Sequence, residues 1–357
     1  MASSDHDPSS PRSAVGSITE IAPAYPNRDR VPPAKRGSTH EITFHPGEPE
    51  LLWISAPTYD VVATIAVASG EVAFYPMAEG SAPHGMAFDA KGRLWVALED
   101  FGKIVELDRQ GKIVKEYDVN LECTTSRKAI LTHPHGLSAG PDGETLWFAC
   151  KATGTVGRIT PDGKVETIAL HTVGSVPIYI KPGPDGNMWA TELVGNAIAR
   201  ITPDGEVTDF PIPTANSRPI AIVPEPGGAA MWFSEEAGNK VARIDMDGKI
   251  TEFPVPMTQP NVILAGLAFD GEGNLWTQQY VDQSRPLPAG PDHLVRIDKA
   301  ILTAPPGDVS GIVFTYYQVP TRNTGMHRII EGPDRNMWFT ELKADRVGRA
   351  ISGLASG

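Results

Sequence analysis

The chain has 357 residues, of which 35 are Gly and 33 are Pro, and 41% are hydrophobic. Frequent Gly and Pro between short apolar segments indicate many tight turns and favour an all-β, turn-rich protein over a disordered one. The formal net charge of -12 at pH 7 leaves no basic stripe that could neutralise phosphates. We therefore expect no nucleic-acid partner.

Only two cysteines occur, Cys123 and Cys150, so no disulfide framework supports the fold. The first residues, MASSDHDPSSPRS, contain no apolar core of signal-peptide length, and no segment approaches the length of a membrane span. We expect a cytoplasmic protein with no membrane partner. Residues 1–15 are rich in Ser, Pro and Asp and are predicted to form a disordered tail.

Tryptophan marks a repeat along the chain. All seven Trp residues stand in the second strand of a predicted hairpin, at a spacing of roughly 40 to 60 residues that is typical of propeller blades. They are Trp53, Trp95, Trp147, Trp189, Trp232, Trp276 and Trp338. A third strand that ends in an Arg-Ile type pair and a fourth strand after a Gly turn, such as GKITEFPVP from Gly248, follow most of them. The repeat predicts an all-β fold, a seven-bladed β-propeller.

The last unit, from Met326 to about Ile351, has no fourth strand after it. Residues 16–23 match the fourth-strand pattern and have no blade of their own before them. Joining the two would close the ring and remove exposed sheet edges. We predict a single propeller domain, residues 16–357, in which an N-terminal strand completes the last blade, and we expect a monomer.

Histidine recurs at one structural position, the opening of a blade's first strand, which lines the central channel. With Pro83-His84-Gly85 as the reference, the equivalent residues in ring order are His40, His84, His135, Ile178, Ile220, Ala265 and His327. Four of the nine histidines thus fall in blades that are contiguous once the ring closes. Such a cluster suits proton transfer or cation binding. The alternative is that each His caps a turn by hydrogen-bonding the backbone.

Carboxylates at the end of the second strand differ in phase. Glu192, Glu235 and Glu341 follow their Trp by three residues and are predicted to hydrogen-bond neighbouring backbone groups. Glu99 follows its Trp by four. Because an antiparallel hairpin brings the start of its first strand beside the end of its second, Glu99 should lie next to His84. A carboxylate there either orients the imidazole and raises its basicity or holds a hard divalent cation.

Several other features of the sequence give weaker indications of a functional site. Cys150 is most simply a small buried apolar residue, and in the segment His133-Pro134-His135 only His135 is expected to point inward. Two segments, 119–133 and 279–295, depart from the regular spacing and are expected to cover a binding face. No Gly-rich phosphate loop, zinc-ligand spacing or nucleophile elbow occurs. Nothing therefore indicates a nucleotide cofactor or acyl-enzyme chemistry.

The segment GPDGNMWATE of residues 183–192, together with Gly205 to Pro213, resembles the repeat of the streptogramin B lyase (virginiamycin B lyase) family. Repeat resemblance covers nearly the whole chain from about residue 16 and implies a seven-bladed propeller. In that family a Pro-His-Gly histidine is a general base, and a Glu four residues after the Trp helps to bind Mg²⁺. Pro83-His84-Gly85 and Glu99 match both positions.

The resemblance also has departures. His40 matches a second family histidine, whereas His135 stands where the family has Tyr. The family carries another Glu two residues before the base, and this chain has Ala82 there. Mg²⁺ is therefore expected on Glu99, in a site that must be completed differently. His135 and the two long segments imply a different substrate.

Together these features predict a carbon-oxygen lyase of small-molecule metabolism that acts on an ester- or lactone-bearing metabolite. His84 would remove a proton next to a carbonyl, and Glu99, with Mg²⁺, would stabilise the enolate. His40 would assist the reaction. The residues expected to bind the substrate are His135, His327 and Arg127. A metal-dependent lactonase, a metal-free cyclase or isomerase, and a propeller that binds a ligand or protein without catalysis remain alternatives.

Overall fold

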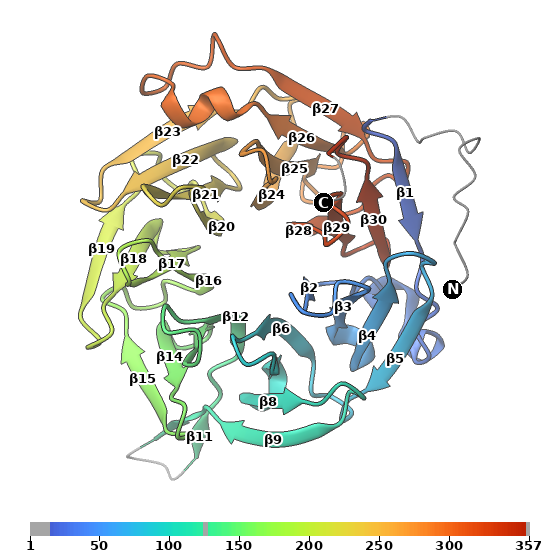
Figure 1. Cartoon of the computed structure of the whole chain (residues 1–357), viewed down its shortest axis with the longest axis vertical. Helices are drawn as coiled ribbons and strands as arrows, with labels where there is room; N and C mark the ends of the chain where they lie inside the picture. The colour runs from blue at the N-terminus through green and yellow to red at the C-terminus, as the bar shows by residue number, and fades with distance from the viewer. Residues whose placement is uncertain (1–14, 124–127, 355–357) are drawn as a thin grey trace, which may run out of the picture.

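Seven antiparallel four-stranded sheets surround a central opening (Figure 1). The computed structural model describes residues 15–123 and 128–354. The arrangement confirms the predicted all-β, seven-bladed β-propeller. Arg127 lies outside the described residues, and so do residues 1–14 of the predicted tail.

The strands of each blade follow one another from the channel outward. Blade one contains β2 (Ile42–Phe44), β3 (Leu51–Ala56), β4 (Val61–Ala66) and β5 (Val72–Pro76). Blade two contains β6 (Pro83–Phe88), β7 (Leu94–Leu98), β8 (Lys103–Leu107) and β9 (Ile113–Asp118). Blade three contains β12 (Pro134–Ala139), β13 (Leu146–Cys150), β14 (Thr155–Ile159) and β15 (Val165–Ala169). A small hairpin between blades two and three consists of β10 (Leu121–Glu122) and β11 (Ala129–Ile130).

The remaining blades repeat this order. Blade four contains β16 (Pro177–Pro182), β17 (Met188–Glu192), β18 (Ala197–Ile201) and β19 (Val207–Pro211). Blade five contains β20 (Pro219–Pro224), β21 (Ala230–Glu235), β22 (Lys240–Asp245) and β23 (Ile250–Pro254). Blade six contains β24 (Val262–Phe269), β25 (Leu275–Val281), β26 (His293–Ile297) and β27 (Phe314–Gln318). Blade seven contains β28 (Met326–Glu331), β29 (Met337–Glu341), β30 (Arg346–Ala350) and β1 (Ile18–Ile21). The short 3-10 turns are η1 (Arg28–Arg30), η2 (Pro33–Lys35), η3 (Pro57–Tyr59), η4 (Glu99–Phe101) and η5 (Lys299–Thr303). Across the described part of the chain, no helix has the length and apolar character that a membrane crossing requires.

Each repeated Trp packs against the following blade. Trp95 of blade two shares a buried cluster with Leu146 and Phe148 of blade three, and Trp338 of blade seven shares one with Leu52 and Ile54 of blade one. A buried indole removes a large apolar area from water, so the repeat supplies the contact that holds neighbouring blades together. The Trp period is therefore the period of the blade interfaces.

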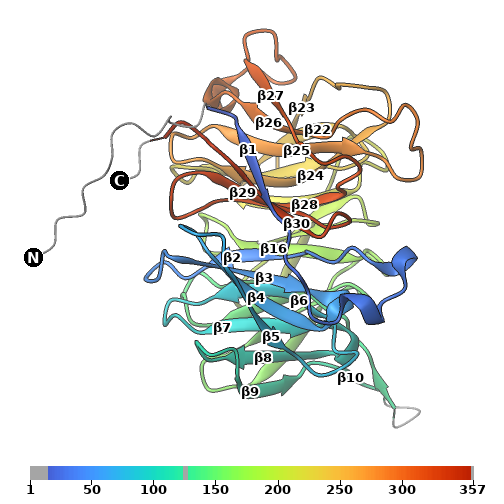
Figure 2. The ribbon, with the colours of Figure 1, turned by 90° about the vertical axis from the view of Figure 1, so that its right-hand side faces the viewer.

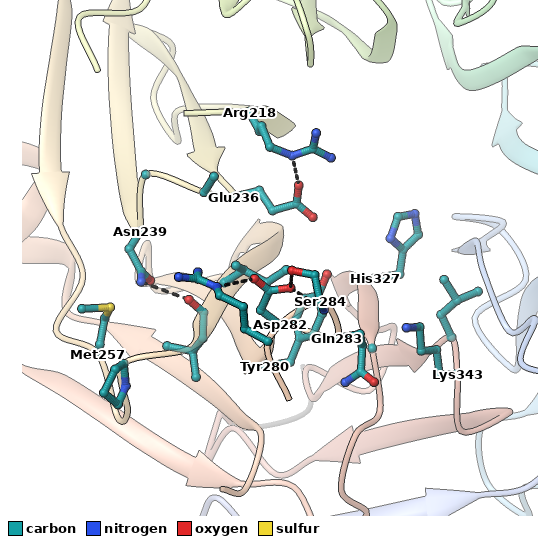
Figure 3. Close-up of a pocket in the computed structure, with 18 residues that line it drawn as sticks. Arg218, Glu236, Asn239, Met257, Tyr280, Asp282, Gln283, Ser284, His327 and Lys343 are labelled. Atoms are coloured by element: carbon teal, nitrogen blue, oxygen red, sulfur yellow. Dashed lines mark hydrogen bonds and ion pairs between the residues drawn. The ribbon is translucent and has the colours of Figure 1, made fainter. Parts of the chain in front are cut away.

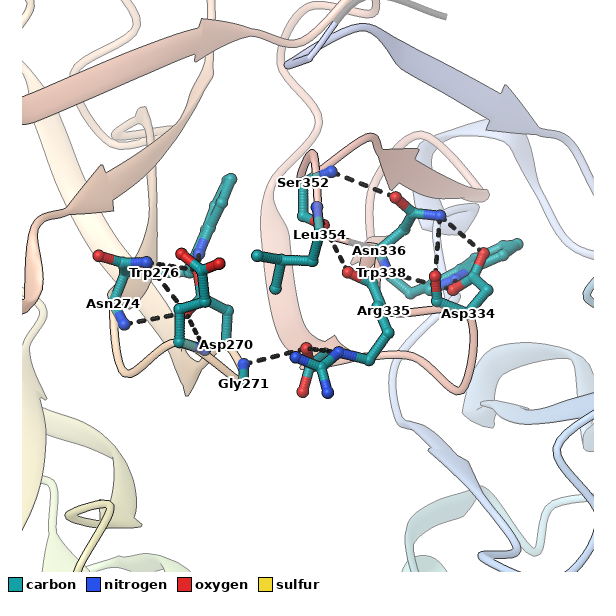
Figure 4. A network of polar contacts seen from close by, with 12 residues as sticks. Asp270, Gly271, Asn274, Trp276, Asp334, Arg335, Asn336, Trp338, Ser352 and Leu354 are labelled. Atoms are coloured by element: carbon teal, nitrogen blue, oxygen red, sulfur yellow. Dashed lines mark hydrogen bonds and ion pairs between the residues drawn. The ribbon is translucent and has the colours of Figure 1, made fainter. Parts of the chain in front are cut away.

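In five of the seven blades the turn before the Trp supplies a carboxylate that accepts from the indole N–H, and Figure 4 shows two of them. The indole N–H of Trp276 donates to Asp270 Oδ2 at 2.8 Å, and that of Trp338 donates to Asp334 Oδ1 at 2.9 Å. Asp89 accepts from Trp95 in the same way at 2.9 Å. These bonds satisfy a buried polar group and explain why Asp recurs in the turn.

The two ends of the described chain meet in blade seven. β1 pairs antiparallel with β30, with Ile18 opposite Ala350 and Ile21 opposite Val347 (Figure 2). The inferred closure of the ring by the N-terminal strand is thus observed. It also places the start of blade one beside the inner strand of blade seven.

The inner strands have a common irregularity where they begin. In blade two the register of β6 against β7 shifts between Pro83 and Met86, and β12, β16, β20, β24 and β28 show corresponding shifts. The residue before the opening Pro is left-handed, with φ of 50° at both Ala82 and His133 and 57° at Arg218. Such irregularities redirect side chains at the rim of a sheet, and here they turn the opening residues toward one mouth of the channel.

Candidate active site

Four histidine side chains meet where the inner strands begin. The ring centroids of His84 and His40 are 3.6 Å apart, those of His84 and His135 are 4.1 Å apart, and those of His40 and His327 are 4.1 Å apart. The structure thus brings together imidazoles from blades seven, one, two and three, which the repeat alignment had placed at one equivalent position.

Glycine allows two of these blades to approach each other. A Cβ atom on Gly85 would lie 1.8 Å from the backbone oxygen of His135, and one on Gly136 would lie 2.4 Å from that of Ile178. No real side chain tolerates such distances, so the residue after the histidine must be Gly in blades two and three. The Pro-His-Gly pattern is therefore partly a packing requirement.

Hydroxyl groups of the preceding blade hold two of the histidine backbones. Ser55 Oγ donates to the carbonyl oxygen of His84 at 2.6 Å, and Thr340 Oγ1 donates to that of His40 at 2.8 Å. Both donors are two residues after a Trp, on the second strand of their blade. The local repeat therefore also positions the next blade's histidine.

Burial keeps the four imidazoles neutral. His40, His84 and His135 are only 5–6% exposed. Desolvation holds the pKa of all four histidines well below its usual range, and the positive charges of their neighbours lower it further. The Nδ1 atoms of His40, His84 and His135 are buried without a hydrogen-bond partner among the described residues. The other ring nitrogen of His84, Nε2, faces Glu99, and a backbone hydrogen bond of Ile178 acts on His135.

Glu99 lies beside His84, at the start of η4. Its Oε2 atom is 3.2 Å from His84 Nε2, and its backbone N–H donates to the carbonyl of Ala82 at 3.1 Å. The side chain is almost completely buried, which raises the pKa of the carboxyl, while the ammonium of Lys151 acts in the opposite direction.

Three further groups at this place were not anticipated from the sequence. Lys151 Nζ pairs with Glu99 Oε1, and His133 Nδ1 lies 3.7 Å from the same oxygen and 3.5 Å from Asp100 Oδ1. The sequence does contain an indication of Lys151, because this residue follows Trp147 by four residues, just as Glu99 follows Trp95 by four. His133 does not join the four imidazoles but points to this outer group.

A second buried pair supports the cluster from within the channel. Arg328 follows His327 in β28 and contacts both oxygens of Glu41 at 3.0 Å. It also donates to His327 Nε2 at 2.9 Å, which assigns the hydrogen of that neutral ring to Nδ1. His327 is therefore oriented by Arg328.

The cluster opens into two adjoining hollows. The first, of about 330 Å³, is lined by His40, His84, Glu99 and Lys151 among others. The second, of about 680 Å³, extends from His327 toward the ion pair of Arg218 and Glu236, whose Nε and Oε2 atoms are 2.8 Å apart (Figure 3). Leu342 borders both hollows, so they adjoin at the mouth of the channel.

The long segments occupy different positions around this mouth. Residues Asp282 to Arg285, between β25 and β26, line the larger hollow. The segment 119–133 ends at His133 beside Glu99. Cys150 is fully buried, and burial raises the pKa of its thiol to about 12, in keeping with a structural role.

The three in-phase glutamates differ from expectation. Glu192, Glu235 and Glu341 are fully buried, and within the described residues none of their carboxylate oxygens bonds a backbone group. The groups that act on them are side chains, Ser175 at Glu192, Ser217 and Glu252 at Glu235, and Glu20 at Glu341. The predicted hydrogen bonds to backbone groups are therefore wrong. Desolvation raises the pKa to about 7 at Glu192 and to about 8 at Glu235 and Glu341, so these carboxyls keep their protons to much higher pH than exposed ones.

The donor atoms around Glu99 decide whether the residues fit Mg²⁺. Potential ligand atoms of Glu99, Asp100 and His133 lie within 4.8 Å of one another. However, both oxygens of Glu99 already face nitrogen atoms, those of Lys151 and His84, and Ala82 offers no second carboxylate. Mg²⁺ requires oxygen ligands, and a divalent ion on Glu99 would meet the lysine ammonium at close range. With Lys151 in place, these residues do not fit the ion.

Comparison with known proteins points to one family. The model of the virginiamycin B lyase family matches residues 124–284, and that of the SMP-30/gluconolactonase/LRE-like region matches residues 56–128. A virginiamycin B lyase of Nocardia farcinica is 32% identical over 112 residues, which are 31% of this chain and 35% of that protein. The match therefore spans about a third of the curated relative.

Solved structures extend the likeness to the whole fold. A streptogramin B lyase structure superposes with a TM-score of 0.74 at 24% identity, covering 93% of this chain and 96% of the other. The virginiamycin B lyase of Staphylococcus aureus has the same TM-score at 26% identity, covering 94% and 99%. That enzyme has also been solved with quinupristin as a catalytically inactive His-to-Ala variant.

The chain is a seven-bladed propeller with a histidine-lined opening, and it is similar in fold to virginiamycin B lyase. The resemblance to the virginiamycin B lyase family, predicted from the Trp repeat and the Pro-His-Gly segment, is confirmed by the family match and by the solved structures.

Proposed function

We propose that this chain is a lyase that opens an ester or lactone by elimination, with His84 as the general base. The observation that carries the proposal is the pairing of a buried neutral imidazole with a carboxylate at an open mouth, His84 Nε2 and Glu99 Oε2 at 3.2 Å. A base must be unprotonated before it reacts, and its cation must be stabilised afterward. Burial supplies the first condition, and Glu99 supplies the second.

In the proposed step the substrate's C–H bond replaces Glu99 Oε2 in front of His84 Nε2, and the carboxylate stays alongside the ring as its counter-charge. His84 Nε2 then takes the proton from a carbon next to a carbonyl, and the electron pair of that C–H bond moves onto the carbonyl oxygen. Collapse of this enolate forms a carbon-carbon double bond and breaks the bond from the neighbouring carbon to the ester oxygen. The leaving group departs as a carboxylate, and no water enters the product. No step of this reaction passes through a metal ion.

The neighbouring histidines hold the substrate. His40 and His135 flank the His84 ring on two sides, with centroids 3.6 Å and 4.1 Å away. The neutral ring of His40, which lines the smaller hollow, can donate one hydrogen bond at Nε2 to a carbonyl or ester oxygen. His327 and the larger hollow would bind the remainder of the molecule.

We would test the proposal with quinupristin and a panel of cyclic esters that carry a hydrogen next to the carbonyl. Ring opening by elimination leaves the mass unchanged and incorporates no label from ¹⁸O-water. The His84→Ala variant should lose at least about 100-fold in kcat/KM. His171→Ala provides a matched control, since His171 is exposed and pairs with Asp209 on the outer surface. A folded His84→Ala variant with near-wild-type turnover would remove His84 from the mechanism.

Lactone hydrolysis is a second candidate because residues 56–128, which include His84 and Glu99, match the SMP-30/gluconolactonase/LRE-like region. Hydrolysis would add one oxygen from labelled water to the product. Binding without turnover of any compound in the panel would instead favour a non-catalytic ligand-binding propeller.

A further inference from the structure

Lys151 lies beside the carboxylate that faces the proposed base. It directly follows β13, and its backbone N–H donates to the carbonyl of His133 at 3.2 Å. Its ammonium pairs with Glu99 Oε1 on the side of the carboxylate away from His84. The side chain is 35% exposed and borders the same hollow as His84. The ammonium is thus both anchored and open to a molecule in the mouth.

The surrounding charges match one cation. Glu99 is the only carboxylate of the group that is buried, because the side chain of Asp100 is 57% exposed. The partner position at Ala82, which is joined to Glu99 through a backbone hydrogen bond, carries no charge. One buried negative charge is therefore already balanced by one positive charge.

We propose that Lys151 takes the place of the divalent cation at this site, so that the reaction needs no metal on Glu99. This inference rests on the proposed function, because it assigns the group that stabilises the enolate. An ammonium has three donor hydrogens, and the bond to Glu99 uses one of them. Another is free to donate to the carbonyl oxygen as negative charge develops there, while His84 removes the proton.

A lysine suits this role for an electrostatic reason. Its charge is fixed at the mouth by Glu99, so it needs no rearrangement when the enolate forms. Removal of Lys151 would leave Glu99 buried without its cation, next to Asp100 and His133, which supply two further ligand atoms. The same residues should then bind a divalent ion. The proposal therefore predicts a change in metal binding that does not depend on knowing the substrate.

The experiment uses Mn²⁺ as a spectroscopic probe for the full-length chain, with free Mn²⁺ followed by electron paramagnetic resonance. Wild-type protein should show no site at Glu99 with a dissociation constant below about 1 mM, which means no binding that Glu99→Gln removes, because ions held by His40, His84 and His135 would remain in that variant. The Lys151→Met variant should bind one Mn²⁺ per chain at least about tenfold more tightly than wild type. Lys151→Arg keeps the charge and should exclude the ion as wild type does.

Lys103→Met is the matched control, because Lys103 is also partly exposed, at 32%, and pairs with Glu116 at 2.6 Å, yet lies away from the mouth. It should bind Mn²⁺ no better than wild type. Tight Mn²⁺ binding by wild-type protein that Glu99→Gln abolishes would overturn the proposal, and so would failure of the folded Lys151→Met and Lys151→Gln variants to bind more ion than wild type. Circular dichroism establishes that each variant is folded.

An activity measurement then separates this inference from the proposed function. If the wild-type protein turns over a compound of the panel, EDTA should leave its kcat unchanged, and Lys151→Met should lower kcat more than it raises KM. Loss of wild-type activity in EDTA, restored by Mg²⁺, would contradict the role of Lys151 while leaving His84 as base. Absence of any turnover would count against the proposed function, and the Mn²⁺ result would still decide whether Lys151 excludes the metal.

Discussion

At the scale of the residue, burial sets the chemistry of His84. A solvent-exposed imidazole is partly protonated near neutral pH, whereas desolvation and the neighbouring cations hold the pKa of His84 well below 6.5. The same ring could not serve as a base in slightly acidic solution if it lay on the surface. Its position in the channel, and not its identity alone, makes it available.

We therefore expect kcat/KM to stay at its plateau as the pH falls through 6.5, the ordinary value for histidine, and to decline only well below it. The acid limb of the kcat/KM profile is expected at low pH because a lowered pKa keeps the imidazole of His84 unprotonated to lower pH. The measurement is a pH profile on whichever panel compound is turned over. An acid limb centred at or above pH 6.5 would assign the base to a more exposed group.

At the scale of the element, a difference of one residue in phase gives two kinds of glutamate. Glu235 lies opposite Pro219 in the register of β20 and β21 and is enclosed between blades, whereas Glu236, one residue later, faces the mouth and pairs with Arg218. Alternation along the strand end explains the contrast. The enclosed glutamates should affect stability, and the outer position should affect binding.

This difference yields a prediction on stability. The native state holds the proton of Glu235 and of Glu341 up to a pKa of about 8, against an ordinary value of 4.5. Their contribution to stability is therefore full below about pH 4.5 and is lost as the pH rises to about 8. The double variant Glu235→Gln/Glu341→Gln should gain thermal stability relative to wild type between pH 5 and pH 9. The surface variant Glu206→Gln should show no such trend, and a constant difference between double variant and wild type would refute the idea.

At the scale of the whole molecule, the site exists only because the ring closes. His40 follows the N-terminal strand, and His327 belongs to the last blade, yet their centroids are 4.1 Å apart. Arg328 reaches across the same junction to Glu41. Closure by β1 therefore stabilises the junction at which two of the four histidines meet.

A truncation tests this dependence. Removal of residues 1–22 deletes β1 and leaves the edge of β30 unpaired. It also exposes the apolar surface that Ile18 and Ile21 cover. We expect a thermal midpoint lower by at least about 2 °C and a tendency to self-associate, measured by calorimetry and gel filtration. Removal of residues 1–14 retains every β1 pair and should leave both properties unchanged. Equal stability of the two truncations would show that β1 is dispensable.

Much of this molecule could be predicted from residues in sequence order. The seven Trp residues, their turn carboxylates and the Gly turns are local signals, and each describes one hairpin whose register its own hydrogen bonds determine. The seven-bladed fold, the closing strand and the common position of four histidines therefore follow from repetition. The adjacency of His84 and Glu99 also lies within one hairpin and needed no knowledge of other blades.

What only the tertiary structure decided lies between blades. Lys151 meets Glu99 from the next blade, Arg328 meets Glu41 across the closure, and the in-phase glutamates lose their expected hydrogen bonds between neighbouring sheets. Contacts of this kind depend on how closely adjacent sheets approach, which Gly85 and Gly136 permit in one part of the ring. A repeat places side chains at equivalent positions, but the packing of unlike blades determines which of them touch, and hence which charge stands beside the base.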